Sequence, residues 1–225
     1  MSRFRRIRSG PTYFFTLVAY HRRPILCDDA IRSALHDAFA QTRARRPFTV
    51  DAIVLMPDHL HCVWTLPDGD LDISTRWSQI KHHVSWTCRG LYDDFICSRS
   101  RRSRGEAAIW QRRFYERMIR SDAELERYID YIHYNPVKHG HAASAAAWPY
   151  SSFQRYVRGG VYPADWGGID GEWGNELECS GGGWTRGRRS RPPHRCQAVH
   201  MDRMDRMVHI VDESIIALQT IGSQH

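Results

Sequence analysis

The chain contains very little lysine and lacks long apolar runs. Of its 225 residues, 32 are Lys or Arg, and only Lys81 and Lys138 are lysines, so 30 are arginines. No run of about eighteen apolar residues occurs, and the apolar stretch that begins at Thr12 is interrupted by His21 and Arg22. We therefore expect neither a membrane-spanning segment nor a signal peptide.

Cysteine is also sparse and is not arranged for metal binding or cross-linking. None of the six cysteines is in a C-x-x-C pair, and Cys62 lies inside an apolar run. This pattern argues against a zinc knuckle and against a disulfide framework. It favours a reducing compartment, and we expect the protein to be cytoplasmic.

The charge that is present is positive. The formal net charge is +7 and the isoelectric point is near 9.3. Residues 1–46 hold ten arginines against three acidic residues. A GC-rich genome would also raise the ratio of arginine to lysine, but it would not explain the positive net charge. Because the planar guanidinium binds phosphate and stacks on bases, an anionic partner is expected.

Periodicity predicts an α+β domain with the order βαββαβ. Strands are expected where aromatic and β-branched residues gather, and helices where apolar residues recur every three or four positions. The expected strands are residues 12–20, 48–56, 60–65 and 109–119, and the expected helices are 28–45 and 74–91. The sequence Ser121-Asp122-Ala123-Glu124 is a capping box that starts another helix. That helix should end near Tyr134, before Pro136, or at Lys138 if the proline only kinks it.

The composition changes after Trp166. Residues 1–166 are expected to form one folded domain, and residues 167–225 a Gly/Arg-rich tail that is too poor in aliphatic side chains to fold. Within the tail, residues 201–221 have the spacing of a short amphipathic helix. Residues 98–105 form a basic loop inside the domain.

His59-Leu60-His61 is the first candidate for chemistry. In a strand these histidines point to one face while Leu60 points to the other, so both imidazoles can share a divalent metal. The structural alternative is a pair of surface histidines on a half-exposed sheet. Asp58 is close in sequence, but strand alternation would direct its side chain to the opposite face.

The second candidate is the segment from Arg127 to Gly140. At 100° per residue, Tyr131 and Asn135 share one flank of a helix, with Lys138 nearby if the helix continues. A phenol becomes an effective nucleophile when a metal polarises its phosphodiester target. The structural alternative is that Tyr131 is a packing residue. Tyr128 is a rival for the role of nucleophile, whereas Tyr134 lies farther round the helix from Asn135.

Four sequence strings carry a family resemblance. MPDHLHCVW, IWQRRFYE, YIDYIHYNPVKHG and WPYSSFQRYV occur in this order. Together they resemble the REP-associated tyrosine transposases of bacteria, which are relatives of single-strand insertion-sequence transposases in the HUH nuclease superfamily. The resemblance extends from about Phe4 to Trp166. It implies a ferredoxin-like antiparallel sheet with helices packed on it.

The resemblance also implies a site and a reaction. The family's metal-binding histidines correspond to His59 and His61, its nucleophilic tyrosine to Tyr131, and its third metal ligand to Asn135, with Mg²⁺ or Mn²⁺ as the cofactor. Attack of Tyr131 on single-stranded DNA would give a 5′-phosphotyrosine and a free 3′-OH. The implied partner is a REP-like hairpin from DNA beside the gene, bound at the bacterial nucleoid. Both a monomer and a homodimer remain open.

Basic side chains could bind the DNA backbone. We expect these contacts from an N-terminal arm and from positions near the fourth strand and the end of the last helix: Arg3, Arg5, Arg6, Arg8, Arg112, Arg113 and Lys138. Four aromatic residues could stack on bases or pack in the core: Trp77, Trp110, Phe114 and Tyr115.

Two other functional classes remain. One is a catalytically inactive, domesticated protein that binds hairpin DNA as a regulator. The other is a metallohydrolase without a covalent intermediate, for which the sequence lacks a third histidine or carboxylate at a zinc spacing. The loop 93–105 and the tail beyond residue 170 depart from the family pattern.

Overall fold

The computed structural model describes residues 10–92 and 109–168. The elements follow the expected order βαββαβ and continue with further helices. They are β1 (Thr12–Val18), a 3₁₀ turn η1 (Tyr20–Arg22), α1 (Asp29–Arg45), β2 (Thr49–Leu55), β3 (His59–Thr65), α2 (Ile73–Thr87), β4 (Tyr115–Ile119), α4 (Asp122–Lys138), η2 (Ala145–Ala147) and α5 (Phe153–Arg158). The predicted N-terminal arm, the predicted basic loop 98–105 and the predicted C-terminal tail from residue 169 onward lie outside the described residues.

The strands form one antiparallel sheet in the order β2-β3-β1-β4. This order, with α1 following β1 and α2 following β3, is the expected ferredoxin-like arrangement. β3 is central and pairs with β1 so that Thr16 lies opposite His61 and Val18 opposite His59. The register therefore places the end of β1 beside both histidines.

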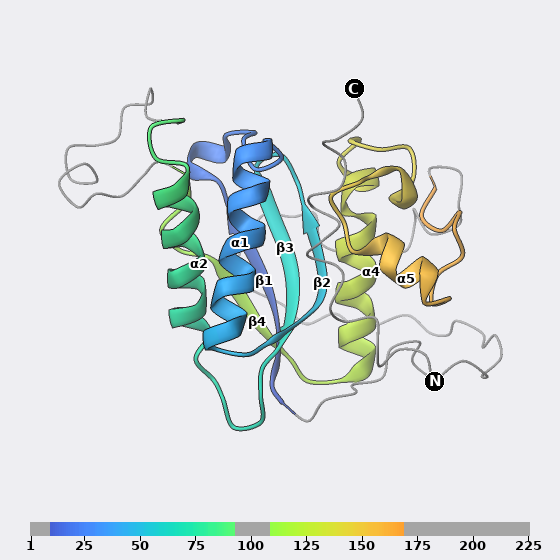
Figure 1. Cartoon of the computed structure of the whole chain (residues 1–225). Coiled ribbons are helices and arrows are strands. Elements are labelled where there is room, and N and C mark those ends of the chain that lie inside the picture. The colour runs from blue at the N-terminus through green and yellow to red at the C-terminus, as the bar shows by residue number, and fades with distance from the viewer. Residues whose placement is uncertain (1–9, 93–108, 169–225) are drawn as a thin grey trace, which may run out of the picture.

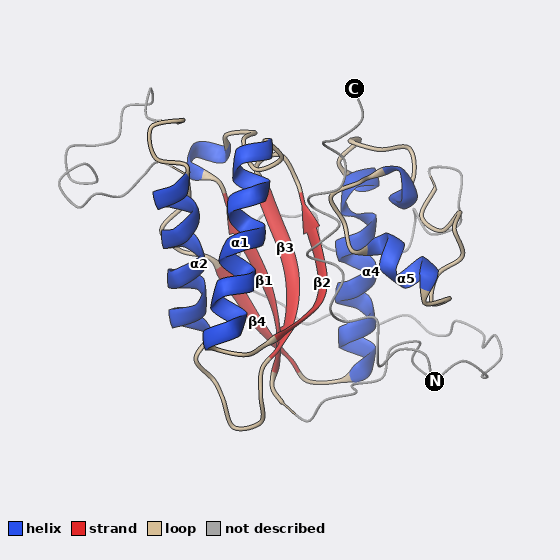
Figure 2. Cartoon of the chain, in the orientation of Figure 1, coloured by secondary structure: helices blue, strands red, loops and turns tan. Residues whose placement is uncertain are grey.

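Helices cover both faces of the sheet (Figures 1 and 2). Leu60, Cys62 and Trp64 of β3 pack in the cluster that includes α1 and α2, while Val63 packs in the cluster that includes α4 and α5. Every residue of β3 is consequently buried. The alternative of surface histidines on a half-exposed sheet is wrong, because α4 covers the face on which they lie.

The helix α4 starts and ends through local hydrogen bonds. Ser121 Oγ accepts from the Glu124 backbone N–H at 3.2 Å, and Glu124 accepts from the N–H of Arg120 rather than that of Ser121. The helix continues through Pro136 to Lys138, the longer of the two expected boundaries. Proline is tolerated here because the helix closes within one turn, where Gly140 adopts a left-handed φ of 71°.

Several element boundaries differ from the expectation. β1 stops at Val18 because the chain turns sharply at η1, and α2 ends at Thr87 rather than Leu91. The predicted strand 109–119 is regular only from Tyr115, preceded by an isolated bridge between Trp110 and Ala19. Between the Trp110 bridge and the first regular pair at Tyr115, the carbonyls of Gln111 and Arg112 accept hydrogen bonds from Lys81 Nζ of α2. These two carbonyls are therefore bonded to a side chain rather than to a neighbouring strand.

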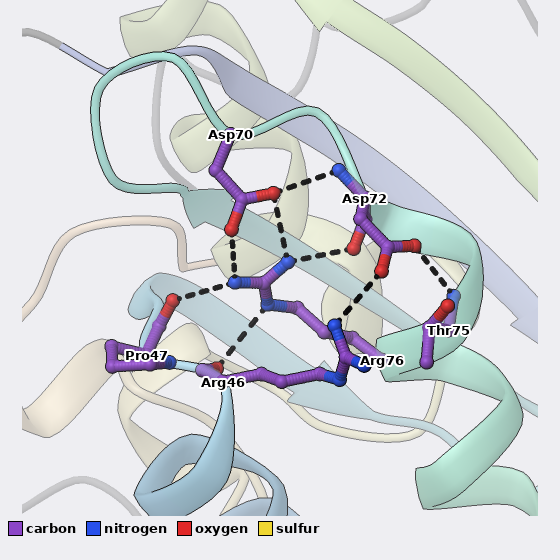
Figure 3. A network of polar contacts seen from close by, with 6 residues as sticks. All are labelled: Arg46, Pro47, Asp70, Asp72, Thr75 and Arg76. Carbon is purple, nitrogen blue, oxygen red and sulfur yellow. Dashed lines mark hydrogen bonds and ion pairs between the residues drawn. The ribbon is translucent and has the colours of Figure 1, made fainter.

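A buried arginine fixes the end of the sheet that is remote from the histidines. Arg76 of α2 donates two hydrogen bonds to the Asp70 carboxylate and further bonds to the carbonyls of Arg46, Pro47 and Asp72 (Figure 3). The Arg76 side chain is only 1% exposed. It therefore joins the end of α1 to the loop before α2 through carbonyls of both segments.

We expect Arg76→Met to destabilise the fold. The substitution removes the five hydrogen bonds that Arg76 donates and leaves the Asp70 carboxylate with the Asp72 N–H as its remaining donor, at a cost of about 3 kcal/mol. Urea unfolding followed by circular dichroism measures the loss. Arg45→Gln, an exposed change in the last turn of α1, is the matched control and should alter stability by less than about 0.5 kcal/mol. Equal stability of the two variants would contradict the assigned role of Arg76.

Candidate active site

Two imidazoles lie side by side beneath α4. The ring centroids of His59 and His61 are 4.8 Å apart, and the residues are 7% and 5% exposed. They share a face of β3 because residues two apart in a strand point the same way. The pair therefore lies in a site that is largely shielded from water.

Each imidazole is held through its Nδ1 atom. Asp58 Oδ1 lies 2.6 Å from Nδ1 of His59, and Thr16 Oγ1 lies 2.8 Å from Nδ1 of His61. The expectation that Asp58 points to the opposite face is wrong, because Asp58 belongs to the turn before β3, where strand alternation does not yet apply. With both Nδ1 atoms engaged, the Nε2 atoms remain for another partner.

The helix α4 brings Tyr131 and Asn135 over these histidines. Asn135 Oδ1 lies 3.3 Å from His59 Nε2, and the Tyr131 ring centroid is 5.2 Å from that of His61. The spacing of four residues places both side chains on one flank of the helix, while Ile129 and Ile132 pack in the core. The expected quartet is thus gathered in one place.

Lys138 completes this flank, since α4 extends to it. Its Nζ is 5.4 Å from the centroid of the Tyr131 ring. At this distance an ammonium interacts with the electrons of the aromatic ring. Lys138 therefore lies beside the candidate nucleophile rather than at an isolated helix end.

Burial keeps the central groups neutral. It raises the pKa of Tyr131. Burial also lowers the pKa of His61 well below its usual value, and the neighbouring His59 and His139 act in the same direction. A neutral imidazole has a lone pair free to bind a cation.

The other tyrosines of α4 have different surroundings. Tyr128 stacks on Phe14 with ring centroids 4.4 Å apart, and burial raises its pKa to about 12. Tyr134 packs edge-on against Trp166 at 6.4 Å. Of the three rings, the ring of Tyr131 is the one that combines a contact with His61 and a nearby cation.

Of the remaining arginines predicted to bind DNA, the structure describes Arg112 and Arg113. Arg112 and Arg113 are exposed on the loop between Gln111, whose N–H donates to Val18, and Tyr115, which pairs with Thr16. They therefore flank the end of β1 beside the histidines. The N-terminal arginines Arg3, Arg5, Arg6 and Arg8 lie outside the described residues.

The predicted stacking aromatics are chiefly core residues. Trp77 is fully buried, Trp110 is 5% exposed, and Phe114 packs against the same cluster. The ring of Tyr115 lies edge-on to Phe14 on the opposite face. Core packing is therefore the role of Trp77 and Trp110.

The polar atoms of the site fit a cation. His59 Nδ1 lies 2.6 Å from Asp58 Oδ1, and His59 Nε2 lies 3.3 Å from Asn135 Oδ1. The Asn135 Nδ2 atom is buried without a hydrogen-bond partner. A cation placed between His59 Nε2 and Asn135 Oδ1 would use both atoms as donors.

The candidate third donor is an amide oxygen rather than a histidine or carboxylate. In the part of the chain that the structure describes, no group of three or more His, Cys, Asp or Glu side chains could hold a metal. The amide oxygen is a donor that suits Mg²⁺ or Mn²⁺, whereas imidazole nitrogens are typical ligands of softer divalent ions.

Sequence reasoning did not assign several neighbours of the site. Thr16 reaches His61 through strand pairing, and His139 lies 5.6 Å from His59 between ring centroids. Thr16 lies in none of the four motif strings and is placed by strand register. His139 lies within YIDYIHYNPVKHG, but its position beside His59 depends on the closing turn of α4. Asp58 is adjacent to His59 in sequence and could have been assigned if the turn had been treated separately from the strand.

None of the helices in residues 10–92 and 109–168 is both long and apolar enough to cross a bilayer.

The three cysteines within these ranges, Cys27, Cys62 and Cys88, are free.

Comparison with known proteins identifies the family. A family model described as "Transposase IS200 like" matches residues 9–135. The chain is 39% identical over 169 residues to the REP-associated tyrosine transposase of Escherichia coli strain K12, covering 75% of this chain and 92% of that protein. A solved structure of a REP-associated tyrosine transposase bound to a REP hairpin is 37% identical with a TM-score of 0.59, covering 77% of this chain and 96% of that one. The chain therefore belongs to the IS200-like transposase family.

Proposed function

We propose that the chain is a metal-dependent endonuclease and strand transferase that acts on single-stranded REP-type hairpins through a 5′-phosphotyrosine. The observation that carries the proposal is the convergence of Tyr131, Asn135, His59 and His61 in one site of a transposase fold. The hairpin substrate is inferred from the related transposase that was solved with a REP hairpin. We place this activity in the bacterial cytoplasm, at the nucleoid.

The Tyr131 oxygen is the proposed nucleophile. It attacks the phosphorus of a DNA phosphodiester, a new bond forms between them, and the bond from phosphorus to the 3′ oxygen breaks. The phenol loses its proton, and the departing 3′ oxygen gains one. Attack of another 3′-OH on the phosphotyrosine reverses the same step and joins the strands.

Other residues of the chain assist this step through charge and position. Lys138 offsets negative charge that develops on the Tyr131 oxygen. The exposed Arg112 and Arg113 would bind backbone phosphates beside the site, with the arginines of the N-terminal arm. His59 and His61, held through Nδ1, keep their Nε2 atoms directed toward the scissile phosphate.

Members of this family depend on a metal ion. We propose Mg²⁺ or Mn²⁺, held here by His59, His61 and Asn135. When bound, such an ion polarises the phosphodiester and helps to orient it. The donor set supports this proposal, because two imidazoles and one amide oxygen leave coordination positions for phosphate oxygens and water.

Tyr131→Phe should abolish the covalent adduct with DNA while hairpin binding persists. Only the phenol oxygen is lost, so packing of the ring against His61 is retained. The measurement is a denaturing gel with 5′- and 3′-labelled hairpin oligonucleotides from the DNA beside the gene, with a native gel for binding. Tyr128→Phe is the matched control and should still form the adduct. An adduct with Tyr131→Phe that equals the wild-type amount would overturn the assignment.

Chelation should stop cleavage reversibly. EDTA is expected to remove the adduct, and added Mn²⁺ or Mg²⁺ to restore it in the wild type but not in His61→Ala. The same gel provides the readout. Hairpin binding without cleavage in every divalent ion tested would instead support the inactive regulatory protein.

Thr16→Val should weaken the metal site without unfolding the protein. It removes the hydroxyl that holds Nδ1 of His61, and loss of such an outer partner lowers metal affinity by about tenfold. Valine suits the strand, so we expect a loss of stability of only about 1 kcal/mol. Calorimetric titration with Mn²⁺ and a thermal melt measure the two effects. An unchanged Mn²⁺ affinity would contradict the positioning role of Thr16.

A further inference from the structure

The turn between β1 and α1 holds an unusual backbone conformation beside the site. His21 and Arg22 have φ values of 54° and 53°, and they are the non-glycine residues of positive φ among those described. Side chains other than glycine rarely adopt this left-handed region, and such strain is typical of functional sites. This backbone conformation directs the Arg22 side chain toward an interaction beside the site.

Arg22 makes that interaction with Asp58. Its Nη1 donates to Asp58 Oδ2 at 3.0 Å, while Asp58 Oδ1 accepts from Nδ1 of His59 at 2.6 Å. The two oxygens of one carboxylate therefore join the arginine to the imidazole. The left-handed turn directs the Arg22 side chain back toward the loop that precedes β3.

The backbone around Arg22 braces the same loop. The N–H of Ala19 donates to the carbonyl of Asp58, and the N–H of Leu26 donates to the carbonyl of Pro57, each at 2.8 Å. The segment 19–26 therefore holds the main chain of the Pro57-Asp58 turn from both sides. Arg22 adds a side-chain contact to the carboxylate oxygen that His59 does not contact.

We propose that Arg22 is a positioning residue that acts on His59 through Asp58. The inference rests on the proposed function, because it concerns the metal-binding role of His59. An Asp58 carboxylate held at one oxygen only can rotate, and the His59 ring then loses its fixed orientation toward Asn135. Arg22 thereby reduces the cost of ordering the imidazole when a cation binds.

Stability alone does not account for the contact. The Arg22 side chain is 67% exposed, and an ion pair in water contributes little to folding. The contact therefore matters for the geometry of the site rather than for the fold. A positioning role and a structural role consequently predict different results when Arg22 is replaced.

The test is Mn²⁺ affinity, measured by titration calorimetry on the full chain without DNA. Arg22→Gln should weaken Mn²⁺ binding by about tenfold, the low end of the range for outer partners of a metal ligand, with an unchanged melting temperature. Arg22→Lys should restore most of the affinity, because an ammonium can still reach Oδ2. Arg45→Gln removes an equal charge at the opposite end of the sheet and should leave the affinity unchanged.

A double-variant cycle shows whether Arg22 acts through Asp58. Asp58→Asn should weaken Mn²⁺ binding by itself, and adding Arg22→Gln should then have no further effect. Independent, multiplicative effects on Mn²⁺ affinity would overturn the inference. So would an Arg22→Gln variant with wild-type Mn²⁺ affinity and weaker DNA binding, because Arg22 would then be a phosphate contact.

Failure of the proposed function gives a different result. If wild-type protein binds Mn²⁺ and the cycle shows coupling, but no DNA adduct forms, the inference on Arg22 stands and the nuclease proposal fails. If the adduct forms and Arg22→Gln alters neither Mn²⁺ affinity nor the rate of cleavage, the nuclease proposal stands and the inference on Arg22 fails.

Discussion

The packing of α4 across the histidine face of β3 is the contact on which the candidate site depends. One face of β3 presents Leu60, Cys62 and Trp64 to α1 and α2, so the opposite face must present the histidines to whatever covers it. The covering element is α4, which is anchored by Ile129 and Ile132. Tyr131 and Asn135 reach the histidines because they lie on the flank next to that apolar stripe.

Burial then determines the chemistry of the site. A shielded imidazole stays neutral and can bind a cation, whereas a shielded phenol resists ionisation. The site therefore needs positive charge to make Tyr131 reactive. In the proposed mechanism Lys138 supplies part of this charge, and a metal ion held by His59, His61 and Asn135 would supply more. The uncharged imidazole and amide side chains and the nearby Lys138 ammonium suit a negatively charged phosphodiester as the substrate group in this site.

Much of this arrangement was predictable from local patterns. The element order follows from the two periodicities, and the pairs His59/His61 and Tyr131/Asn135 follow from the strand and helix repeats. The extension of α4 through Pro136 was one of two predicted boundaries. The family motifs singled out these four residues from the thirteen histidines and ten tyrosines of the chain.

The supporting contacts depend on distant pairings and could not be predicted in the same way. Thr16 lies beside His61 through the register of β1 on β3, and Arg22 reaches Asp58 through a left-handed turn that no glycine marks. The sequence also left open whether Trp77 packs or stacks on DNA, because an amphipathic helix does not reveal what covers its apolar face.

The most direct test of the account is to locate the DNA attachment by mass spectrometry. Trypsin should release residues 128–138 as one peptide, which contains Tyr128, Tyr131 and Tyr134. Fragmentation of this peptide after reaction with a hairpin and nuclease trimming identifies the modified ring. The account predicts a nucleotide on Tyr131. A nucleotide on Tyr128 or Tyr134 would contradict it.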